Sequence, residues 1–376
     1  MRTLIINGQV FRNDSRSFAP MDILIEDGKI LEVASRGAFS CLDANVIDAK
    51  EKRIVSGLVD VHTHGIGGYD FLLADGDALK KMSEVYREHG VTCVMPTLAS
   101  ASFEDMLCAA KRIRDCKIDS FCGVHIEGRY LNPKKRGAHA EELLSELDSS
   151  ELCEYEKLCL PALHISAAFE LDMDKTFAKK ALSIGATLGL AHTNATYQEA
   201  LECERAGISA YTHLYNAMPP LHHRDGGPVA ACLLGNAFAE LICDGIHISA
   251  ETVALTYSIK RDKLVLISDS MEATCCSDGE YSIAGNPVTV KDQIARTHDG
   301  ALAGSTLTLD KAVCNLMRFC NISLEDAIIC ATEAPAKEVG IFDTCGSIDV
   351  SKRADILILG DGDFEIERVF SVRDFF

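Results

Sequence analysis

Eight short apolar runs, most of them followed by a helical pattern, constrain the fold of this chain more than any other feature. They predict strands at Val59–His62, Val91–Met95, Phe121–Ile126, Ala162–Ala168, Thr187–Ala191, Ser209–Thr212, Glu240–Cys243 and Leu264–Ile267. Such alternation indicates parallel βα units, and eight of them within about 290 residues predict a closed (β/α)8 barrel. An open doubly wound sheet is the alternative, but no GxGxxG motif follows the first strand.

The two ends of the chain differ from this alternating middle. Near the N-terminus the apolar runs Ile23–Glu26 and Lys29–Val33 are separated by Asp27-Gly28, a dipeptide that strongly favours a hairpin. The last part of the chain has a similar run at Ala354–Leu359. We therefore predict an α/β protein in which a TIM-type barrel, the catalytic domain, takes residues 55–344. A small β-sandwich domain takes residues 1–54 and 345–376.

Charge and cysteine usage exclude several classes of partner. The chain has 37 basic and 56 acidic residues, and the formal net charge of -19 rules out bulk attraction to nucleic acid or to an anionic membrane. The 16 cysteines lie mostly singly and form no CxxC motif, which favours a reducing cytoplasm over a disulfide framework. No apolar run reaches the roughly 18 residues of a membrane span, and the N-terminal run is too short for a signal peptide. We expect a cytoplasmic protein.

Residues of metal-binding type gather where the predicted strands end. His62 and His64 close the first strand, and their spacing of two puts both imidazoles on one face of it. The other strand ends supply Glu127, His192, His213, His247 and Asp269. In barrels of this class the chemistry lies at the carboxyl ends of the strands. Imidazole and carboxylate groups at one height suit a zinc-like catalytic ion with a coordination position left for water.

Each of these histidines alone has an ordinary explanation, because a histidine at a strand end is often only hydrogen-bonded. Their coincidence at five strand ends favours a metal site instead. His89 at a helix end, His164 within a strand and His298 before a turn lack that coincidence, and we expect structural roles for them. His125 shares a strand face with Glu127, where packing or orientation of a ligand is expected rather than ligation.

Seven stretches together resemble a known family. They are GLVDVHTHG at 57–65, HIEG at 125–128, NPKKRGAH at 132–139, AHTNAT at 191–196, THLYNAM at 212–218, DGIH at 244–247 and LAGST at 302–306. In this order they are similar to the amidohydrolase superfamily, and specifically to its N-acetylglucosamine-6-phosphate deacetylase family, over nearly the whole chain. The HxH pair alone indicates only the superfamily, whereas NPKKxGAH, THLxNAM and LAGST are much more specific.

The resemblance implies one or two divalent ions per subunit. Glu127, His192 and His213 would bind the main ion, and His62 and His64 would bind a second ion that Glu127 bridges to the first. Zinc is the first expectation, with iron, manganese, cobalt or nickel as alternatives that the ligand types also accept. The carboxylated lysine that many amidohydrolases carry on strand four has no counterpart in Ala162–Glu170.

The resemblance also implies a reaction. A metal-activated water would hydrolyse the acetamide of N-acetylglucosamine 6-phosphate to glucosamine 6-phosphate and acetate, in amino-sugar catabolism or cell-wall recycling. Asp269 would serve as general base and then acid, and His139 would help to polarise the acetyl carbonyl. In the family, the arginine matching Arg224 reaches across a homodimer interface to the phosphate in the neighbouring site. The substrate contacts would be Ala138, His139, Asn216, Ala217, Arg224, His247, Leu302, Ala303 and Gly304.

Other interpretations stay open beside this one. N-acetylgalactosamine 6-phosphate differs only in the orientation of its 4-hydroxyl, and the sequence does not separate the two sugars. A hydantoinase- or deaminase-type amidohydrolase is more remote, because the strand-four lysine is missing and a phosphate loop is present. A non-catalytic scaffold is disfavoured because every ligand and base position is filled. Arg129-Tyr130 replaces the usual Pro-Phe and Asp225-Gly226-Gly227 follows Arg224, which alters loops near the sugar.

Overall fold

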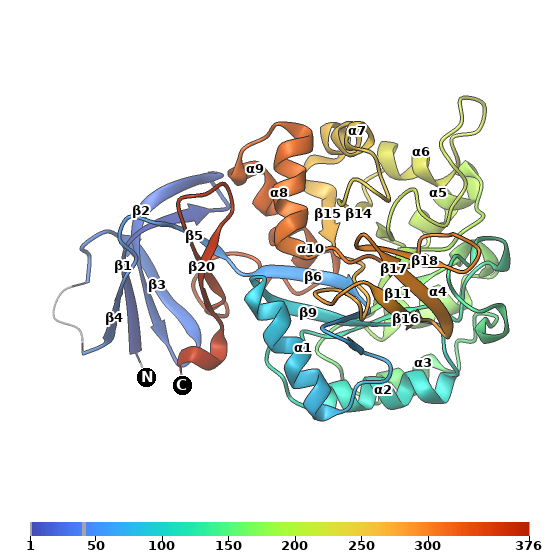
Figure 1. The fold of residues 1–376 in the computed structure, drawn as a ribbon, viewed down its shortest axis with the longest axis horizontal. Helices are drawn as coiled ribbons and strands as arrows, with labels where there is room; N and C mark the ends of the chain where they lie inside the picture. The colour runs from blue at the N-terminus through green and yellow to red at the C-terminus, as the bar shows by residue number, and fades with distance from the viewer. Residues whose placement is uncertain (1, 40–42, 376) are drawn as a thin grey trace.

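In a computed structural model of the chain, which describes residues 2–39 and 43–375, eight parallel strands form the central sheet. The strands are β6 (Leu58–Thr63), β9 (Val91–Leu98), β10 (Val124–Glu127), β11 (Leu163–Ala167), β12 (Thr187–Leu190), β13 (Ala210–Tyr211), β14 (Phe238–Ile242) and β15 (Leu264–Ile267). They pair in chain order from β6 to β15, as the alternating pattern predicts. The expected barrel is confirmed, with its layer of helices outside (Figure 1).

The barrel closes between β6 and β15 without a regular ladder. The carbonyls of Cys330 and Ala331 accept from the backbone N–H groups of Leu266 and Val59, at 2.8 and 2.9 Å. At the carboxyl end the N–H of Asp269 donates to the carbonyl of His62 at 2.9 Å. The segment at Cys330–Ala331 therefore lies between β6 and β15 at one end of the barrel. The chain that follows β15 joins the two strands at the carboxyl end.

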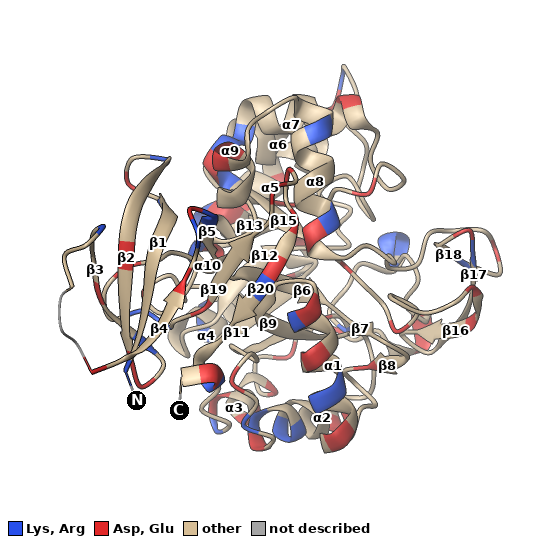
Figure 2. Cartoon of the chain, turned by 60° about the vertical axis from the view of Figure 1, so that its left-hand side comes forward, with Lys and Arg blue, Asp and Glu red and all other residues tan. Residues whose placement is uncertain are grey.

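Helices cover the outside of this sheet. They are α1 (Gly76–Glu88), α2 (Phe103–Asp115), α3 (Leu152–Glu156), α4 (Thr176–Ser183), α5 (Tyr197–Arg205), α6 (Gly227–Leu234), α7 (Ala250–Lys260), α8 (Leu309–Cys320), α9 (Leu324–Ile329) and α10 (Glu333–Glu338). In α1 and α2, acidic residues lie in the first turn and basic residues in the last turn (charged residues are coloured in Figure 2). No helix within the described ranges is long and apolar enough to cross a membrane.

Most predicted strand boundaries differ from the observed ones by one to three residues, and the start of the third strand is among the largest differences. The third strand was expected to begin at Phe121, but β10 begins at Val124, and Phe121 makes only an isolated bridge with Val94. Gly123 explains the difference, because a Cβ there would lie 2.5 Å from the carbonyl oxygen of Ala162. The close approach of the two backbones displaces the start of the ladder to Val124, which pairs with Leu163.

Both termini contribute to a separate mixed sheet, on the left of Figure 1. Its seven strands are β1 (Arg2–Arg12), β2 (Ser17–Glu26), β3 (Lys29–Ser35), β4 (Asn45–Asp48), β5 (Arg53–Ser56), β19 (Ile356–Leu359) and β20 (Ile366–Phe370). Asp27 and Gly28 form the predicted hairpin turn, with φ of 47° and 73°. Ile5, Ile23 and Ile356 belong to a buried cluster of its own. The domain boundaries at 54/55 and 344/345 stay a prediction, and residues 1, 40–42 and 376 lie outside the described residues.

A three-stranded antiparallel sheet follows β15 and was not foreseen. It consists of β16 (Gly279–Ile283), β17 (Asn286–Lys291) and β18 (Ile294–Thr297). It packs with Met271 and Ala303 in a small apolar cluster next to the carboxyl end of the barrel. A smaller pair, β7 (Gly65–Ile66) and β8 (Tyr69–Asp70), follows β6 directly. Both additions lie on loops that leave the carboxyl ends of barrel strands, where the candidate ligands lie.

Candidate metal centre

Three of the predicted site residues turn the chain sharply as their strands end. His192, His213 and Asp269 have positive φ values of 42°, 34° and 47°, a left-handed backbone that costs free energy for residues other than glycine. All three are buried, and their side chains meet over the mouth of the barrel. Three of the site's side chains are therefore carried by strained backbone.

One half of the centre is formed by Glu127, His192 and His213. Glu127 Oε1 lies 2.9 Å from His213 Nε2 and 3.3 Å from His192 Nε2. The two imidazole nitrogens are 3.2 Å apart. Three elements supply these residues, since Glu127 ends β10 and the histidines follow β12 and β13. The predicted main ligand set is brought within reach of a single ion.

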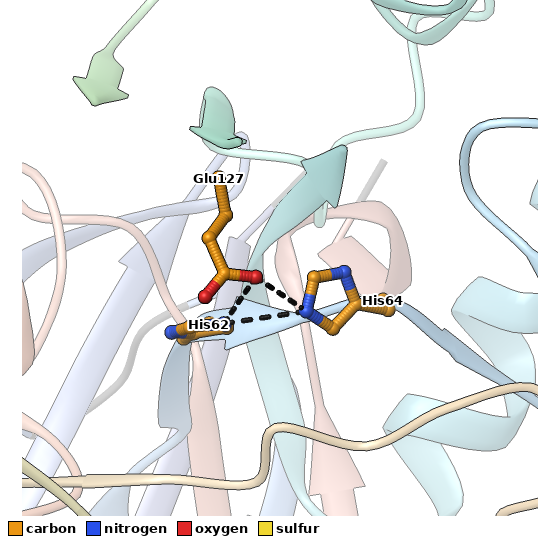
Figure 3. Close-up of side chains that lie close together, drawn as sticks. All are labelled: His62, His64 and Glu127. Carbon is orange, nitrogen blue, oxygen red and sulfur yellow. Dashed lines mark hydrogen bonds and ion pairs between the residues drawn. The ribbon is translucent and has the colours of Figure 1, made fainter. Parts of the chain in front are cut away.

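The other half is formed by His62 and His64 around the second oxygen of the same carboxylate (Figure 3). Glu127 Oε2 lies 3.0 Å from His64 Nε2 and 3.4 Å from His62 Nε2. The two Nε2 atoms are 3.4 Å apart. Glu127 therefore faces both groups of histidines, one with each oxygen, which is the arrangement of a bridging carboxylate.

The hydrogen bonds on the far side of the rings decide which nitrogens carry protons. His192 Nδ1 lies 2.8 Å from the carbonyl oxygen of Lys135, and His62 Nδ1 lies 3.0 Å from Glu240 Oε2. Both partners only accept, so each Nδ1 must be the protonated nitrogen and each Nε2 turns a lone pair inward. A buried cluster of nitrogen lone pairs and carboxylate oxygens needs positive charge, and the donor set fits a divalent transition-metal ion.

Electrostatics within the cluster agree with this assignment. Burial lowers the pKa of His64, but Asp269 and Glu127 outweigh it and raise this pKa to about 9. Burial raises the pKa of Glu127, but His62, His192 and His213 outweigh it and hold that pKa well below the ordinary value. Without an ion, protons supply the positive charge that the carboxylates require, so an ion and protons compete for these nitrogens and ion binding releases protons.

Asp269 lies at the edge of the second half. Its Oδ1 is 3.4 Å from His64 Nε2 and 3.6 Å from His62 Nε2. Burial raises its pKa, but the two histidines more than offset this, so the carboxyl is ionised at neutral pH. Its carbonyl accepts from Ser305 N at 2.7 Å. The result is an anchored carboxylate, free of a proton, directly beside the ligand nitrogens.

His139 faces the centre from the loop after β10. The backbone N–H of Ser100 donates to His139 Nδ1 at 3.3 Å, which makes Nδ1 the acceptor and Nε2 the protonated nitrogen. Burial, followed by the charge of His192, lowers the pKa of His139 to about 3, so the ring is neutral. Its Nε2 lies 3.8 Å from Glu127 Oε2. A neutral N–H donor therefore points at the mouth of the barrel.

The predicted substrate contacts fall into four groups. His247, Leu302 and Gly304 line a cavity of about 290 Å³. Ala138, Asn216 and Ala217 lie on loops that follow strands whose ends supply candidate ligands. Ala303 packs with Met271 in the small apolar cluster next to Asp269. Arg224 lies apart on an exposed loop, and no group within residues 2–39 and 43–375 pairs with its guanidinium. Its role in this chain stays a prediction.

Sequence reasoning missed Glu240, which stands behind the second half. Besides accepting from His62, Glu240 Oε2 lies 3.3 Å from the backbone N of His213. Glu338 of α10 lies against it, and burial, then the charge of Glu240, raises the pKa of Glu338 well above its ordinary value. Glu338 therefore keeps its proton while Glu240 stays ionised. The available signal was a carboxylate inside the apolar run Phe238–Ile242.

The remaining histidines behave largely as expected. His125 bonds Thr97 Oγ1 at 3.1 Å and Ser166 Oγ at 2.8 Å, so both of its nitrogens are occupied by hydroxyls. His164 Nδ1 bonds Thr187 Oγ1 at 2.8 Å, and its Nε2 lies 3.8 Å from Glu240 Oε1. Neither ring reaches Glu127 as the four candidate histidine ligands and His139 do. His125 packs against His62 with 4.7 Å between ring centroids.

A barrel that gathers imidazole lone pairs around a carboxylate at its carboxyl rim belongs to the class of metal-dependent hydrolases. The chain belongs to the amidohydrolase family, whose sequence pattern matches residues 53–372. This match spans the barrel and the strands β19 and β20, so it covers the whole candidate site.

Named relatives resemble the chain over most of their length. The N-acetylglucosamine-6-phosphate deacetylase of Vibrio furnissii is 32% identical over 358 residues, covering 91% of this chain and 89% of the relative. The N-acetylgalactosamine-6-phosphate deacetylase of Escherichia coli O157:H7 is 31% identical over 335 residues, covering 86% and 88%. The crystal structure of the N-acetylglucosamine-6-phosphate deacetylase of Pasteurella multocida superposes with a TM-score of 0.92 at 25% identity, covering 99% and 98%.

Proposed function

We propose that this protein hydrolyses the acetamide of N-acetylglucosamine 6-phosphate to glucosamine 6-phosphate and acetate. The observation that carries the proposal is the position of Glu127, which faces two pairs of histidines with its two oxygens while Asp269 lies beside one pair. Relatives at 32% identity are named for this reaction. We propose two divalent ions per subunit, zinc first among the candidates, held by Glu127 together with His192, His213, His62 and His64.

Bound ions at this centre would activate water and polarise the acetyl carbonyl. Asp269 would accept the proton of the attacking water on its carboxylate and return it to the amine nitrogen as the C–N bond breaks. The low pKa of the carboxyl keeps it ready to accept, and burial keeps competing water away. His139 would donate its Nε2–H to the carbonyl oxygen, which gains negative charge as the tetrahedral intermediate forms.

The sugar and its phosphate would be held by the groups around the mouth. His247 Nδ1 lies 2.6 Å from Asp244 Oδ2, which orients its ring over the cavity that Leu302 and Gly304 also line. Ala138, Asn216, Ala217 and Ala303 would complete this pocket. We propose that Arg224 binds the phosphate in the neighbouring subunit of a homodimer, which would give its unpaired guanidinium a partner.

The galacto sugar remains the second candidate, because a relative of nearly equal identity is named for N-acetylgalactosamine 6-phosphate. The deciding experiment is acetate release from both phosphorylated sugars by the purified protein, first with a chelator and then with Zn²⁺, Fe²⁺ or Mn²⁺. We expect the gluco sugar to have the higher kcat/KM and the activity to return with metal. A higher kcat/KM for the galacto sugar would overturn the proposed substrate, and undiminished activity in chelator would overturn the metal mechanism.

The role of Arg224 has its own test. Arg224→Ala should raise KM for N-acetylglucosamine 6-phosphate at least about tenfold, as expected for loss of a charged hydrogen-bonding pair. KM for unphosphorylated N-acetylglucosamine should stay the same. Equal effects on both sugars would remove the phosphate role. Because the proposed contact crosses a dimer interface, mixing Arg224→Ala with an inactive Asp269→Asn subunit should restore part of the activity.

The remaining parts of the proposal concern the setting of the enzyme. We propose that it works in the cytoplasm, where the reducing conditions suit its many thiols. We also propose that residues 55–344 form the catalytic domain and that residues 1–54 and 345–376 form a separate β domain. Limited proteolysis near these boundaries would test that division.

A further inference from the structure

A second constellation of reactive side chains lies outside the metal centre, where the loop after β15 meets α1 and α8. Cys275 Sγ lies 3.3 Å from Nε2 of His89, which caps the C-terminus of α1. The other nitrogen of that ring, Nδ1, lies 3.1 Å from Oδ2 of Asp310 in the first turn of α8. Thiol, imidazole and carboxylate therefore stand in line, each within hydrogen-bonding reach of the next.

This order matches the general requirement for an activated nucleophile: a base beside it and a third group that orients the base. Asp310 only accepts, so it keeps the proton on His89 Nδ1 and leaves Nε2 for the thiol. The hydrogen bond to Asp310, with that to Cys275, raises the pKa of His89 to about 10. A cationic ring beside the sulfur favours the thiolate, which is the reactive form of cysteine.

Two titratable side chains that interact with Cys275, those of Tyr86 and Cys276, are held neutral. Burial raises the pKa of the Tyr86 phenol, so that side chain of α1 is neutral. Burial also raises the pKa of the adjacent Cys276 thiol, which stays protonated. Burial raises the pKa of Asp310, but His89 and Thr308 outweigh it, so the carboxylate is ionised and stabilises the imidazolium.

The position of Cys275 decides which reagents can reach it. Its residue is exposed to solvent, unlike buried thiols such as Cys93 and Cys232. Other exposed cysteines exist at Cys108, Cys153, Cys159 and Cys314. None of these four has a histidine within hydrogen-bonding distance in the part of the chain that the structure describes. The chain therefore contains its own unactivated controls.

We propose that Cys275, His89 and Asp310 form a thiol-modification site that reacts with small disulfides from solvent. The Cys275 thiolate would attack one sulfur of a low-molecular-weight disulfide, so that a mixed disulfide forms as the original S–S bond breaks. The second sulfur leaves as a thiolate, and a free thiol reverses the step by the same exchange. No further oxidant is needed, because the reagent itself is reduced.

The test uses the metal-loaded protein and dithiodipyridine, a chromogenic disulfide, at less than one equivalent. Peptide mapping by mass spectrometry should find the first label on Cys275, with fragmentation separating it from Cys276. At pH 7 its rate should exceed the rates at Cys108 and Cys153, which have no imidazole beside the sulfur in the described part of the chain.

Variants assign the effect to the constellation. His89→Gln should slow labelling of Cys275 at least about tenfold, because the positive charge beside the attacking sulfur is lost, and Asp310→Asn should slow it less. Labelling of Cys153 is the internal control for folding and should not change, and Cys276→Ser should leave the rate at Cys275 unaltered. Equal labelling of Cys275 and Cys153 in the parent protein would overturn the proposal, and so would an unchanged rate in a folded His89→Gln variant.

Discussion

The two halves of the metal centre are built in different ways around one carboxylate. His62 lies in β6 and His64 follows the strand directly, and their spacing of two residues puts both rings on the same side. His192 and His213 come from separate strand ends, and each reaches Glu127 only through a left-handed backbone turn. One half thus depends on a local repeat, whereas the other depends on the closure of the whole barrel.

Support from behind also differs between the halves. His62 Nδ1 bonds Glu240, a charged side chain that the fold must bury, whereas His192 Nδ1 bonds only the carbonyl of Lys135. A carboxylate behind a histidine raises its basicity as a ligand more than a neutral carbonyl does. The His62–His64 half therefore has the stronger electrostatic support. The positions of His192 and His213 depend instead on the backbone turns that carry them.

The largest difference is expected when a ligand is removed from each half in turn. His192→Asn should leave acetate release at background, because the half with the implied main ion is lost. His62→Asn should retain about one ion per subunit and a measurable fraction of activity. Metal analysis of both variants, with acetate release beside it, checks this order. Equal loss of metal and activity in the two variants would show that the halves do not differ.

Asp269→Asn addresses the group beside the centre rather than a ligand. Turnover should fall by about 10²–10⁴-fold, the usual contribution of a general base, because the amide cannot accept the water's proton. Bound metal should stay nearly unchanged, since Glu127 and the four proposed histidine ligands are all retained and the amide oxygen keeps the shape of the carboxylate it replaces. Full activity in this variant would remove Asp269 as the base.

Glu240→Gln tests the support behind His62. Loss of this carboxylate should weaken ion binding at the His62–His64 half by about 10–100-fold, while the other half keeps its affinity. Stepwise metal titration followed by metal analysis separates the two affinities. Glu338→Gln is the matched control, because an amide resembles the protonated carboxyl it replaces. Equal weakening of both halves by Glu240→Gln would mean that this residue supports the fold and not one ligand.

The smallest effect on activity is expected for a substitution at Gly304, which lines the cavity close to the backbone of Asp269. Its φ is +59°, and a Cβ there would lie 3.3 Å from the carbonyl oxygen of Asp269. Gly304→Ala should lower the free energy of unfolding by about 1–2 kcal/mol and also reduce kcat. Gly300→Ala is the control, with φ of +88° but nothing within 4 Å of the added Cβ. Urea unfolding should show strain in both variants, while activity should fall only in Gly304→Ala.

Much of this architecture was predictable from the sequence, for identifiable reasons. The eight barrel strands are continuous apolar runs, and the Asp27-Gly28 turn has a strong local signal. The sheet β16–β18 was missed because its strands are short and mix polar with apolar residues. The left-handed backbone at His192 and His213 could not be predicted, because these positions are not glycine.

The candidate ligands could be found, but their arrangement could not. Sequence order places His62, Glu127 and His213 far apart, and only a closed barrel brings Nε2 and carboxylate oxygens to within 3.4 Å. The contact of Cys275 with His89 was equally hidden, because it joins a helix end to a loop 186 residues away. Pairings that depend on tertiary closure leave no periodic trace in the chain.

The most direct test of the two-half centre is anomalous diffraction from crystals loaded with Zn²⁺ or Mn²⁺, measured at the absorption edge of that metal. The account predicts two peaks per subunit, one near Glu127 Oε1 between His192 and His213 and one near Glu127 Oε2 between His62 and His64. A single peak at either half, or a peak that Glu127 does not touch, would contradict a carboxylate-bridged pair.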